Sequence, residues 1–435
     1  MTTFHQLSPA IRAAVAGGGG GPAAIRELRS AQLSKHLLLI GNLLTTWPDA
    51  AGEPAEITAL LERVRADAPD AFRGVIGAPL VGAWAAIATR AVRQGAADPA
   101  HFRHLGALAG VACAAAGLDG RVEVPVQDGL VVLPGLGAAV VPPAGTAELV
   151  VAAGRVTIRS GTATVPVPDD PTAAGRDWQP VRRLRAAAAG MVFEVGLDDL
   201  HPYRHGHHVP PANRLSDAEI MLWQASFEEA WRLLAERLPE RAAELQVGLR
   251  TLVPLVRDDR TARSATLRHA FGVFGLTQPA TAEDLAVTMV HEFQHSKLSA
   301  VLDLTRLTRA DDTGRYFAPW RADPRPLAGL LQGVYAFFGV ADTWRALRAA
   351  PGLGELAEKR FAAARLQVDT GLAAIEASGG LTAAGEQFVA VLRSATDVLL
   401  SEPASPAHVR AAEEALAHTR KMWHERFLAR QNIGA

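Results

Sequence analysis

The strongest constraint on the fold is a change of hydrophobic pattern near residue 120. Residues 23–115 repeat apolar side chains every three or four positions, which is typical of amphipathic helices. Residues 121–168 alternate instead, as at Val122 and Val124, and their short apolar runs are bounded by Gly, Pro or Asp. This pattern indicates strands joined by tight turns. Long helical patterns return from residue 327 onward.

We therefore predict an α+β fold that is mostly helical, with a small antiparallel β-rich insert after the N-terminal helical unit. The predicted division is an N-terminal helical unit at 1–118, a β-rich region at 119–200 and a helical metal-binding region at 201–435. Residues 191–195 are expected to add a further strand. The glycine run at 17–21 lacks the Lys-Ser/Thr pair of a phosphate loop, so we interpret it as a flexible turn.

Charge and cysteine content exclude several kinds of site. The 44 basic and 45 acidic residues leave no basic surface for nucleic acid or for an anionic membrane. The single cysteine, Cys113, cannot form an intrachain disulfide, a cysteine-ligated zinc site or an iron–sulfur cluster. We see no signal peptide and no apolar segment long enough to span a membrane, so we expect a cytoplasmic protein. The oligomeric state stays open.

One short motif points to chemistry. His291-Glu292-Phe293-Gln294-His295 is an HExxH sequence in a predicted helix over 281–304, which begins with the capping sequence Thr281-Ala282-Glu283-Asp284. Residues four apart on a helix project from the same face, so His291 and His295 can place two imidazoles on one ion. The motif therefore predicts a single divalent metal ion bound by these two histidines.

The residues after the motif do not supply the third ligand of a typical zinc peptidase. In such a peptidase Glu292 would be the general base for a metal-bound water. A metzincin carries glycine three residues and histidine six residues after its second histidine, where this chain has Leu298 and Val301. No glutamate occurs between Glu292 and Glu355. The sequence therefore argues against this kind of peptidase without excluding it.

Two aspartates are candidates for the third ligand. Asp303 lies eight residues after His295, about 12 Å along an unbroken helix, so it could reach the ion only if the helix broke. Asp342 follows the largely apolar run at 334–341, where a carboxylate needs a partner. A ligand, a helix cap and a salt bridge are all compatible with that position. The third ligand stays open at this point.

Two loops carry further candidate residues. The segment 316–326 contains three prolines that restrict its backbone and present Arg321 and Arg325, whose guanidinium groups suit a carboxylate. Pairing of either arginine with Asp323 is the structural alternative. The segment 201–208 could bind metal, contact substrate or form a solvated loop, because it contains four histidines: His201, His205, His207 and His208.

Several motifs together resemble one known family, the HExxH-motif peptide-modification proteins of ribosomal peptide biosynthesis. The resemblance covers nearly the whole chain. Because the chain lacks a cysteine trio for a radical SAM cluster, it resembles the stand-alone form of the family. The matching segments are His291-Glu292-Phe293-Gln294-His295-Ser296-Lys297-Leu298, Leu302-Asp303-Leu304, Ala318-Pro319-Trp320-Arg321, Asp323-Pro324-Arg325-Pro326, Gly329-Leu330-Leu331-Gln332-Gly333-Val334-Tyr335-Ala336, Pro202-Tyr203-Arg204 and residues 33–39.

The resemblance implies Fe(II)- and 2-oxoglutarate-dependent β-hydroxylation of a residue in a ribosomally synthesised precursor peptide. By this resemblance His291 and His295 hold iron, and Arg321 or Arg325 grips the distal carboxylate of 2-oxoglutarate. Glu292 would orient a metal ligand without binding the metal itself, rather than act as a general base. Two histidines and one carboxylate, with open positions, are the usual ligand set of non-haem iron oxygenases.

Two positions depart from the family pattern. Members tend to carry histidine after the Tyr-Ala pair, where this chain has Phe337, and aspartate before Pro-Tyr-Arg, where it has His201. The first departure would weaken or alter metal binding, and the second would change the peptide that is accepted. Two alternatives therefore remain beside the hydroxylase: a zinc-dependent HExxH metallopeptidase that processes a precursor peptide, and a catalytically silent peptide-binding partner.

Overall fold

The helical N-terminal sequence and the strands that follow it share one hydrophobic core. The structure is a computed structural model that describes residues 5–206, 209–257 and 262–433. Trp84, Phe102 and Leu149 lie in this N-terminal core, so helices and strands bury the same apolar residues. Its helices and those leading into it are α1 (Pro9–Ala16), α2 (Gly21–Thr45), the 3-10 helix η1 (Asp49–Ala51), α3 (Ala55–Asp67), α4 (Pro69–Ile76), α5 (Pro79–Arg93) and α6 (Pro99–Ala116).

Two small antiparallel sheets confirm the predicted β-rich insert. One sheet has the order β1-β4-β5-β6 and the other the order β2-β3-β7. Gly106 of α6 lies so close to β1 that a Cβ would come within 2.3 Å of the Glu123 carbonyl oxygen, so helix and sheet meet at backbone distance. The strands are β1 (Gly120–Pro125), β2 (Leu130–Leu133), β3 (Gly137–Val140), β4 (Thr146–Ala152), β5 (Arg155–Ser160), β6 (Ala163–Pro166) and β7 (Trp178–Pro180).

A five-stranded mixed sheet, in the order β11-β12-β10-β9-β8, forms the middle of the molecule. The strand expected at 191–195 is present as β9 (Met191–Leu197), paired antiparallel with β8 (Arg182–Ala188). The sequence did not predict β10 (Thr251–Pro254), β11 (Ser264–Thr266) or β12 (Val273–Leu276). Strand β10 is parallel to both β9 and β12, and β12 is buried throughout, so it shows no polar alternation.

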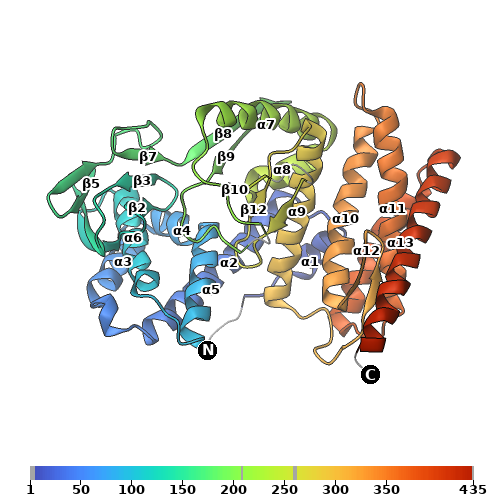
Figure 1. Cartoon of the computed structure of the whole chain (residues 1–435), viewed down its shortest axis with the longest axis horizontal. Coiled ribbons are helices and arrows are strands. Elements are labelled where there is room, and N and C mark those ends of the chain that lie inside the picture. Colours follow the sequence, from blue (N-terminus) through green and yellow to red (C-terminus); the bar gives the residue numbers. More distant parts are fainter. Residues whose placement is uncertain (1–4, 207–208, 258–261, 434–435) are drawn as a thin grey trace.

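Long helices cover this sheet and complete the chain. In Figure 1 the yellow α9 stands between the green sheet and the orange α10, and α10 to α13 lie side by side at one end of the molecule. The fold is thus α+β and mostly helical, as predicted. The remaining elements are α7 (Asp217–Arg237), α8 (Pro239–Gly248), α9 (Ala282–Leu304), β13 (Tyr316–Ala318), β14 (Arg321–Arg325), α10 (Leu327–Leu347), α11 (Gly354–Glu376), α12 (Ala383–Ser401) and α13 (Pro406–Ile433).

The N-terminal glycine run is part of the second, larger core rather than a free turn. Gly18 is buried with a φ of +80°, and a Cβ there would lie 2.3 Å from the Phe338 ring. Its carbonyl oxygen accepts hydrogen bonds from Gln294 Nε2 at 3.1 Å and from Lys297 Nζ at 2.8 Å. Lys297 also pairs with Glu244 at 2.7 Å. The interpretation as a flexible turn was therefore wrong, because partners distant in sequence hold the segment against α9.

In the described part of the chain, no single helix is long and apolar enough to cross a membrane. Helices α4 and α5 meet the length and composition test only when taken together, and they are bent by 60° at the break between them.

Candidate metal centre

The HExxH motif lies in the middle of α9, as its sequence predicted. The side chain of Thr281 accepts a hydrogen bond from the Asp284 N–H and begins the helix, which continues unbroken to Leu304. Met289 and Phe293 are buried in the larger core and anchor one face of the helix. The two histidines of the motif therefore face away from that core, towards a cavity.

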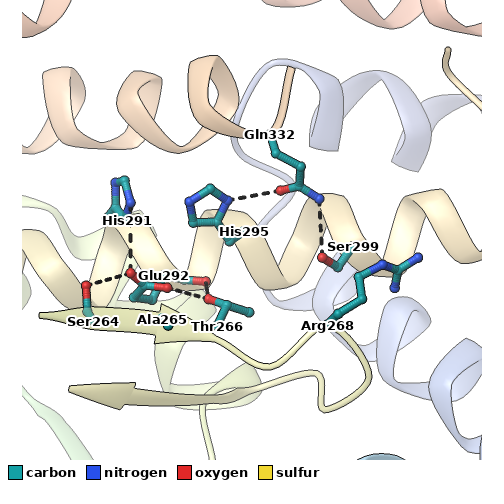
Figure 2. A pocket seen from close by; sticks show the side chains of 9 residues that line it. All are labelled: Ser264, Ala265, Thr266, Arg268, His291, Glu292, His295, Ser299 and Gln332. Atoms are coloured by element: carbon teal, nitrogen blue, oxygen red, sulfur yellow. Dashed lines mark hydrogen bonds and ion pairs between the residues drawn. The ribbon is translucent and has the colours of Figure 1, made fainter. Parts of the chain in front are cut away.

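The two histidine rings lie next to each other at this cavity. The centroids of His291 and His295 are 4.8 Å apart, with the rings at 86° to one another. The cavity has a volume of about 400 Å³, and Figure 2 shows both rings above the helix that carries them. Its lining residues are Ser264, Ala265, Thr266, Arg268, His291, Glu292, His295, Ser299 and Gln332.

A neighbouring amide fixes the orientation of His295. Its Nδ1 lies 3.0 Å from Oε1 of Gln332, and Nε2 of Gln332 lies 3.3 Å from the Ser299 hydroxyl (Figure 2). An amide oxygen only accepts hydrogen bonds, so Nδ1 of His295 carries the hydrogen. The other ring nitrogen, Nε2, therefore has a free lone pair that can bind a metal ion.

His291 is also suited to bind a metal as a neutral imidazole. Burial lowers the pKa of His291 to about 4, and the nearby His295 adds to this effect. The ring is therefore uncharged at neutral pH. Together the two histidines provide two nitrogen ligands from one helix face, which fits two coordination positions of a divalent ion.

Hydroxyl groups from β11 hold Glu292 of the motif in place. Ser264 donates to Oε1 at 2.7 Å, and Thr266 donates to Oε2 at 2.5 Å. The side chain is only 3% exposed, and Oε1 lies 3.9 Å from Nε2 of His291. Because both carboxylate oxygens already accept hydrogen bonds, Glu292 is fixed beside the histidines.

In the part of the chain that the structure describes, no third protein ligand joins the two histidines. Among the described residues, no three His, Cys, Asp or Glu side chains are grouped to hold a metal ion. Asp303 pairs instead with Lys35 and Arg268, each at 2.8 Å, and α9 does not break to bring it closer. The other candidate, Asp342, pairs with cations at 3.0 Å and 2.9 Å, namely Arg241 and Arg345. The described residues thus supply two metal ligands and no third.

An aromatic side chain lies where the family pattern places a histidine. The ring of Phe337 meets His291 edge to face, with centroids 5.5 Å apart, and stacks on Trp320 at 4.6 Å and 15°. Gly333 makes room for this stack, because a Cβ there would lie 2.0 Å from the Trp320 ring. Phe337 and Trp320 therefore form an apolar wall beside the histidines.

The two arginines expected to bind 2-oxoglutarate are engaged elsewhere. Nε of Arg321 and Nε of Arg325 lie 2.6 Å and 3.5 Å from the carboxylate of Asp323, and neither arginine is among the cavity-lining residues. The arginine that does line the cavity is Arg268, which follows β11. Sequence reasoning missed it because nothing in the linear sequence connects Arg268 with the motif on α9.

The histidine-rich segment at 201–208 does not form a metal site in the described residues. His201 is buried in the N-terminal half of the molecule, where its Nδ1 accepts the Tyr203 N–H at 3.2 Å. Its ring lies 5.3 Å from that of His104. Of the other predicted candidates of the segment, His205 is exposed, and His207 and His208 lie outside the described residues.

Comparison with known proteins adds no family to this picture. No protein-family model matches the chain, and no curated protein matches it. The function is therefore argued from the site alone.

Proposed function

We propose that this chain is an Fe(II)- and 2-oxoglutarate-dependent hydroxylase that acts on a residue of a ribosomally synthesised precursor peptide. His291 and His295 would hold the metal. The observation that carries the proposal is a cavity with the adjacent imidazoles of His291 and His295 towards one end and the guanidinium group of Arg268 at the other (Figure 2). Bound iron with its cosubstrate would supply the oxidising chemistry, and the chain would bind and orient the reactants.

A cosubstrate that itself binds the metal would suit the two protein ligands found among the described residues. A 2-oxo acid offers a carboxylate and a neighbouring keto oxygen, which can occupy positions that His291 and His295 leave open. The aromatic wall of Phe337 and Trp320 would limit the access of water on one side of the site. Both features suit a reaction in which the metal binds a small acid before it meets the peptide.

The strand beside the cavity favours a peptide substrate. Strand β11 is the edge of the mixed sheet, and the Thr277 N–H donates to the Arg263 carbonyl at 2.9 Å. In an antiparallel pair, every second residue bonds to the partner strand with its main-chain groups. Because Arg263 bonds to β12 in this way, the main-chain groups of Ser264 and Thr266 point away from β12. An edge strand of this kind can pair with an extended peptide and place it over the cavity.

A second candidate function is zinc-dependent hydrolysis of the precursor peptide. The position of Glu292 at the cavity, 3.9 Å from His291, favours it, because a peptidase needs a general base there. One observation argues against it: hydroxyl groups hold both carboxylate oxygens of Glu292. The lack of a third metal ligand among the described residues applies to both functions alike.

The test is to incubate the purified chain with Fe(II), 2-oxoglutarate and the short peptide encoded beside its gene. We expect the peptide to gain the mass of one oxygen atom while succinate forms, and we expect His295→Ala to form neither product. Peptide cleavage with zinc and without 2-oxoglutarate would establish the peptidase instead. An unchanged peptide mass with confirmed metal loading would contradict the hydroxylase.

The variant Glu292→Gln separates the two functions. The amide keeps the shape of the side chain and removes its basicity, so a peptidase should lose its activity. A hydroxylase in which Glu292 only holds the site in shape should keep part of its activity.

A further inference from the structure

The cavity holds a cation whose partners do not neutralise it. Arg268 is 43% exposed, and its Nη2 lies 2.8 Å from Oδ1 of Asp303. Lys35 shares the same carboxylate, with Nζ 2.8 Å from Oδ2. Two cations thus meet one described anion, and His269 beside them stays neutral because burial lowers its pKa to about 4. This end of the cavity is therefore positively charged.

Two side chains of helix α2 bind Asp303 and hold it in place. Besides Lys35, Gln32 donates to Oδ2 of Asp303 at 3.0 Å. Burial opposes ionisation of Asp303, but the charges of Lys35 and Arg268 outweigh it and lower the pKa of this carboxyl. Asp303 is thus an ionised support that orients Arg268. A guanidinium group has five N–H donors, so the pair leaves several free for a ligand in the cavity.

A polar path runs from the histidines to this cation. Ser299 lies one helical turn beyond His295, about 6 Å along α9. Because its hydroxyl oxygen accepts from Gln332, the hydroxyl hydrogen remains to donate. Figure 2 shows His291, His295, Ser299 and Arg268 in succession along the helix. A ligand bound at the histidines would thus meet hydroxyl and guanidinium donors at its other end.

We infer that Arg268, assisted by Ser299, is the receptor for a carboxylate at the end of the cavity remote from the histidines. The carboxylate is either the distal group of a dicarboxylic 2-oxo acid or an acidic group of the peptide. This inference rests on the proposed function for the nature of these ligands. It assigns to Arg268 the role that the family resemblance implied for Arg321 or Arg325, and it makes Asp303 a positioning residue instead of a metal ligand.

The experiment measures binding rather than turnover, so its outcome does not depend on hydroxylation. The anaerobic Fe(II)-loaded chain is titrated with 2-oxoglutarate and with 2-oxobutyrate, which lacks the distal carboxylate. A third titration uses N-acetyl-glutamate methylamide as a probe for a peptide carboxylate. The variants are Arg268→Gln, the charge-retaining Arg268→Lys, and Arg321→Gln as a matched control outside the cavity. Fe(II) affinity and thermal unfolding of each variant show that the fold and the metal site persist.

We expect the unaltered chain and Arg321→Gln to prefer 2-oxoglutarate over 2-oxobutyrate by roughly tenfold or more, the effect of a charged hydrogen bond. Arg268→Gln should lose this preference while its affinities for 2-oxobutyrate and Fe(II) stay unchanged, and Arg268→Lys should keep part of it. If Arg268→Gln loses affinity only for N-acetyl-glutamate methylamide, the carboxylate belongs to the peptide. The inference is overturned if Arg268→Gln changes neither the affinity for 2-oxoglutarate nor that for N-acetyl-glutamate methylamide. It is also overturned if Arg321→Gln removes the preference for 2-oxoglutarate.

Discussion

Two pairs of histidines in this molecule have almost the same ring geometry but very different surroundings. The rings of His291 and His295 are 4.8 Å apart at 86°, and those of His104 and His201 are 5.3 Å apart at 79°. The first pair lines a cavity and is oriented by an amide. The second pair is 1% exposed at each residue and packs against Tyr203.

The comparison teaches that adjacent imidazoles are not sufficient for a metal site. In the buried pair, Nε2 of His104 has no hydrogen-bond partner among the described residues, and in those residues neither pair has a third His, Cys, Asp or Glu ligand. Aromatic contacts with Trp84 and Tyr203 stabilise this pair as part of the core. Access from a cavity and a fixed lone pair, rather than ring distance, distinguish His291 and His295.

The largest expected effect is a difference in metal affinity when a histidine of each pair is replaced by phenylalanine. His291→Phe should lower metal affinity by roughly 100-fold or more, because losing even an outer-shell partner of a ligand costs about 10–100-fold. His104→Phe should leave metal affinity unchanged. Metal titration of both variants measures this difference, and equal losses in the two variants would show that the pairs do not differ in function.

The stability of the same two variants provides the control. His104→Phe keeps an aromatic ring and removes a buried nitrogen without a partner, so unfolding free energy should change by no more than about 1 kcal/mol. His291→Phe should also leave the fold intact, since the Phe337 wall beside it is already apolar.

Lowering the pH should reduce the stability of the folded chain through the buried pair, His104 and His201. Burial, followed by the charge of Arg204, lowers the pKa of His201 from 6.5 to about 3. Burial also lowers the pKa of His104 well below its usual range, with smaller effects of His201 and His101. The unfolded chain therefore binds protons that the folded chain does not. Stability should be fully present above pH 6.5 and fall below it, by about 1.4 kcal/mol per pH unit for each such histidine.

Chemical unfolding at pH 7 and pH 5 measures this loss. His104→Phe should reduce the dependence on pH because it removes one of the histidine rings whose pKa burial lowers. Asp198 has a pKa raised by burial, so it takes up its proton on the folded chain and offsets part of the loss at the acid end. An identical pH dependence in the unaltered chain and in His104→Phe would contradict the assignment.

The smallest expected effect tests whether residue 337 can supply a third metal ligand. Phe337→His would place an imidazole beside His291, where the two rings already lie 5.5 Å apart. We expect metal affinity to rise by roughly tenfold, about 1.4 kcal/mol, which is modest because the new ring must also leave its stack on Trp320. Phe337→Leu is the matched control and should leave affinity unchanged. A histidine variant that binds no better than the leucine variant would show that residue 337 lies outside the coordination sphere.

The sequence predicted the parts of this molecule that depend on local pattern. The helix carrying the motif and its cap at Thr281 follow from short-range preferences, and the structure confirms both. The alternating strands after residue 120 were found for the same reason. Strands β10 and β12 were missed because short buried strands resemble any apolar run, and β11 was missed because it has only three residues and is partly exposed.

The surroundings of the site were harder to predict, because they depend on contacts between distant segments. Ser264 and Thr266 hold Glu292 from a strand that the sequence did not reveal. Arg268 reaches the cavity only because β11 ends beside α9. Asp303 was a reasonable candidate ligand by composition, but its ion pairs with α2 cannot be read from the linear sequence.

The attachment of the glycine run to α9 has a consequence for the order of assembly during translation. The bond between Gly18 and Gln294 joins residues 276 positions apart, and the one between Gly18 and Lys297 spans 279. The first twenty residues therefore leave the ribosome long before their partners are synthesised. Until then, the carbonyl groups of this segment must be solvated by water, and the helix with both histidines can reach its final environment only after the chain's beginning returns to it.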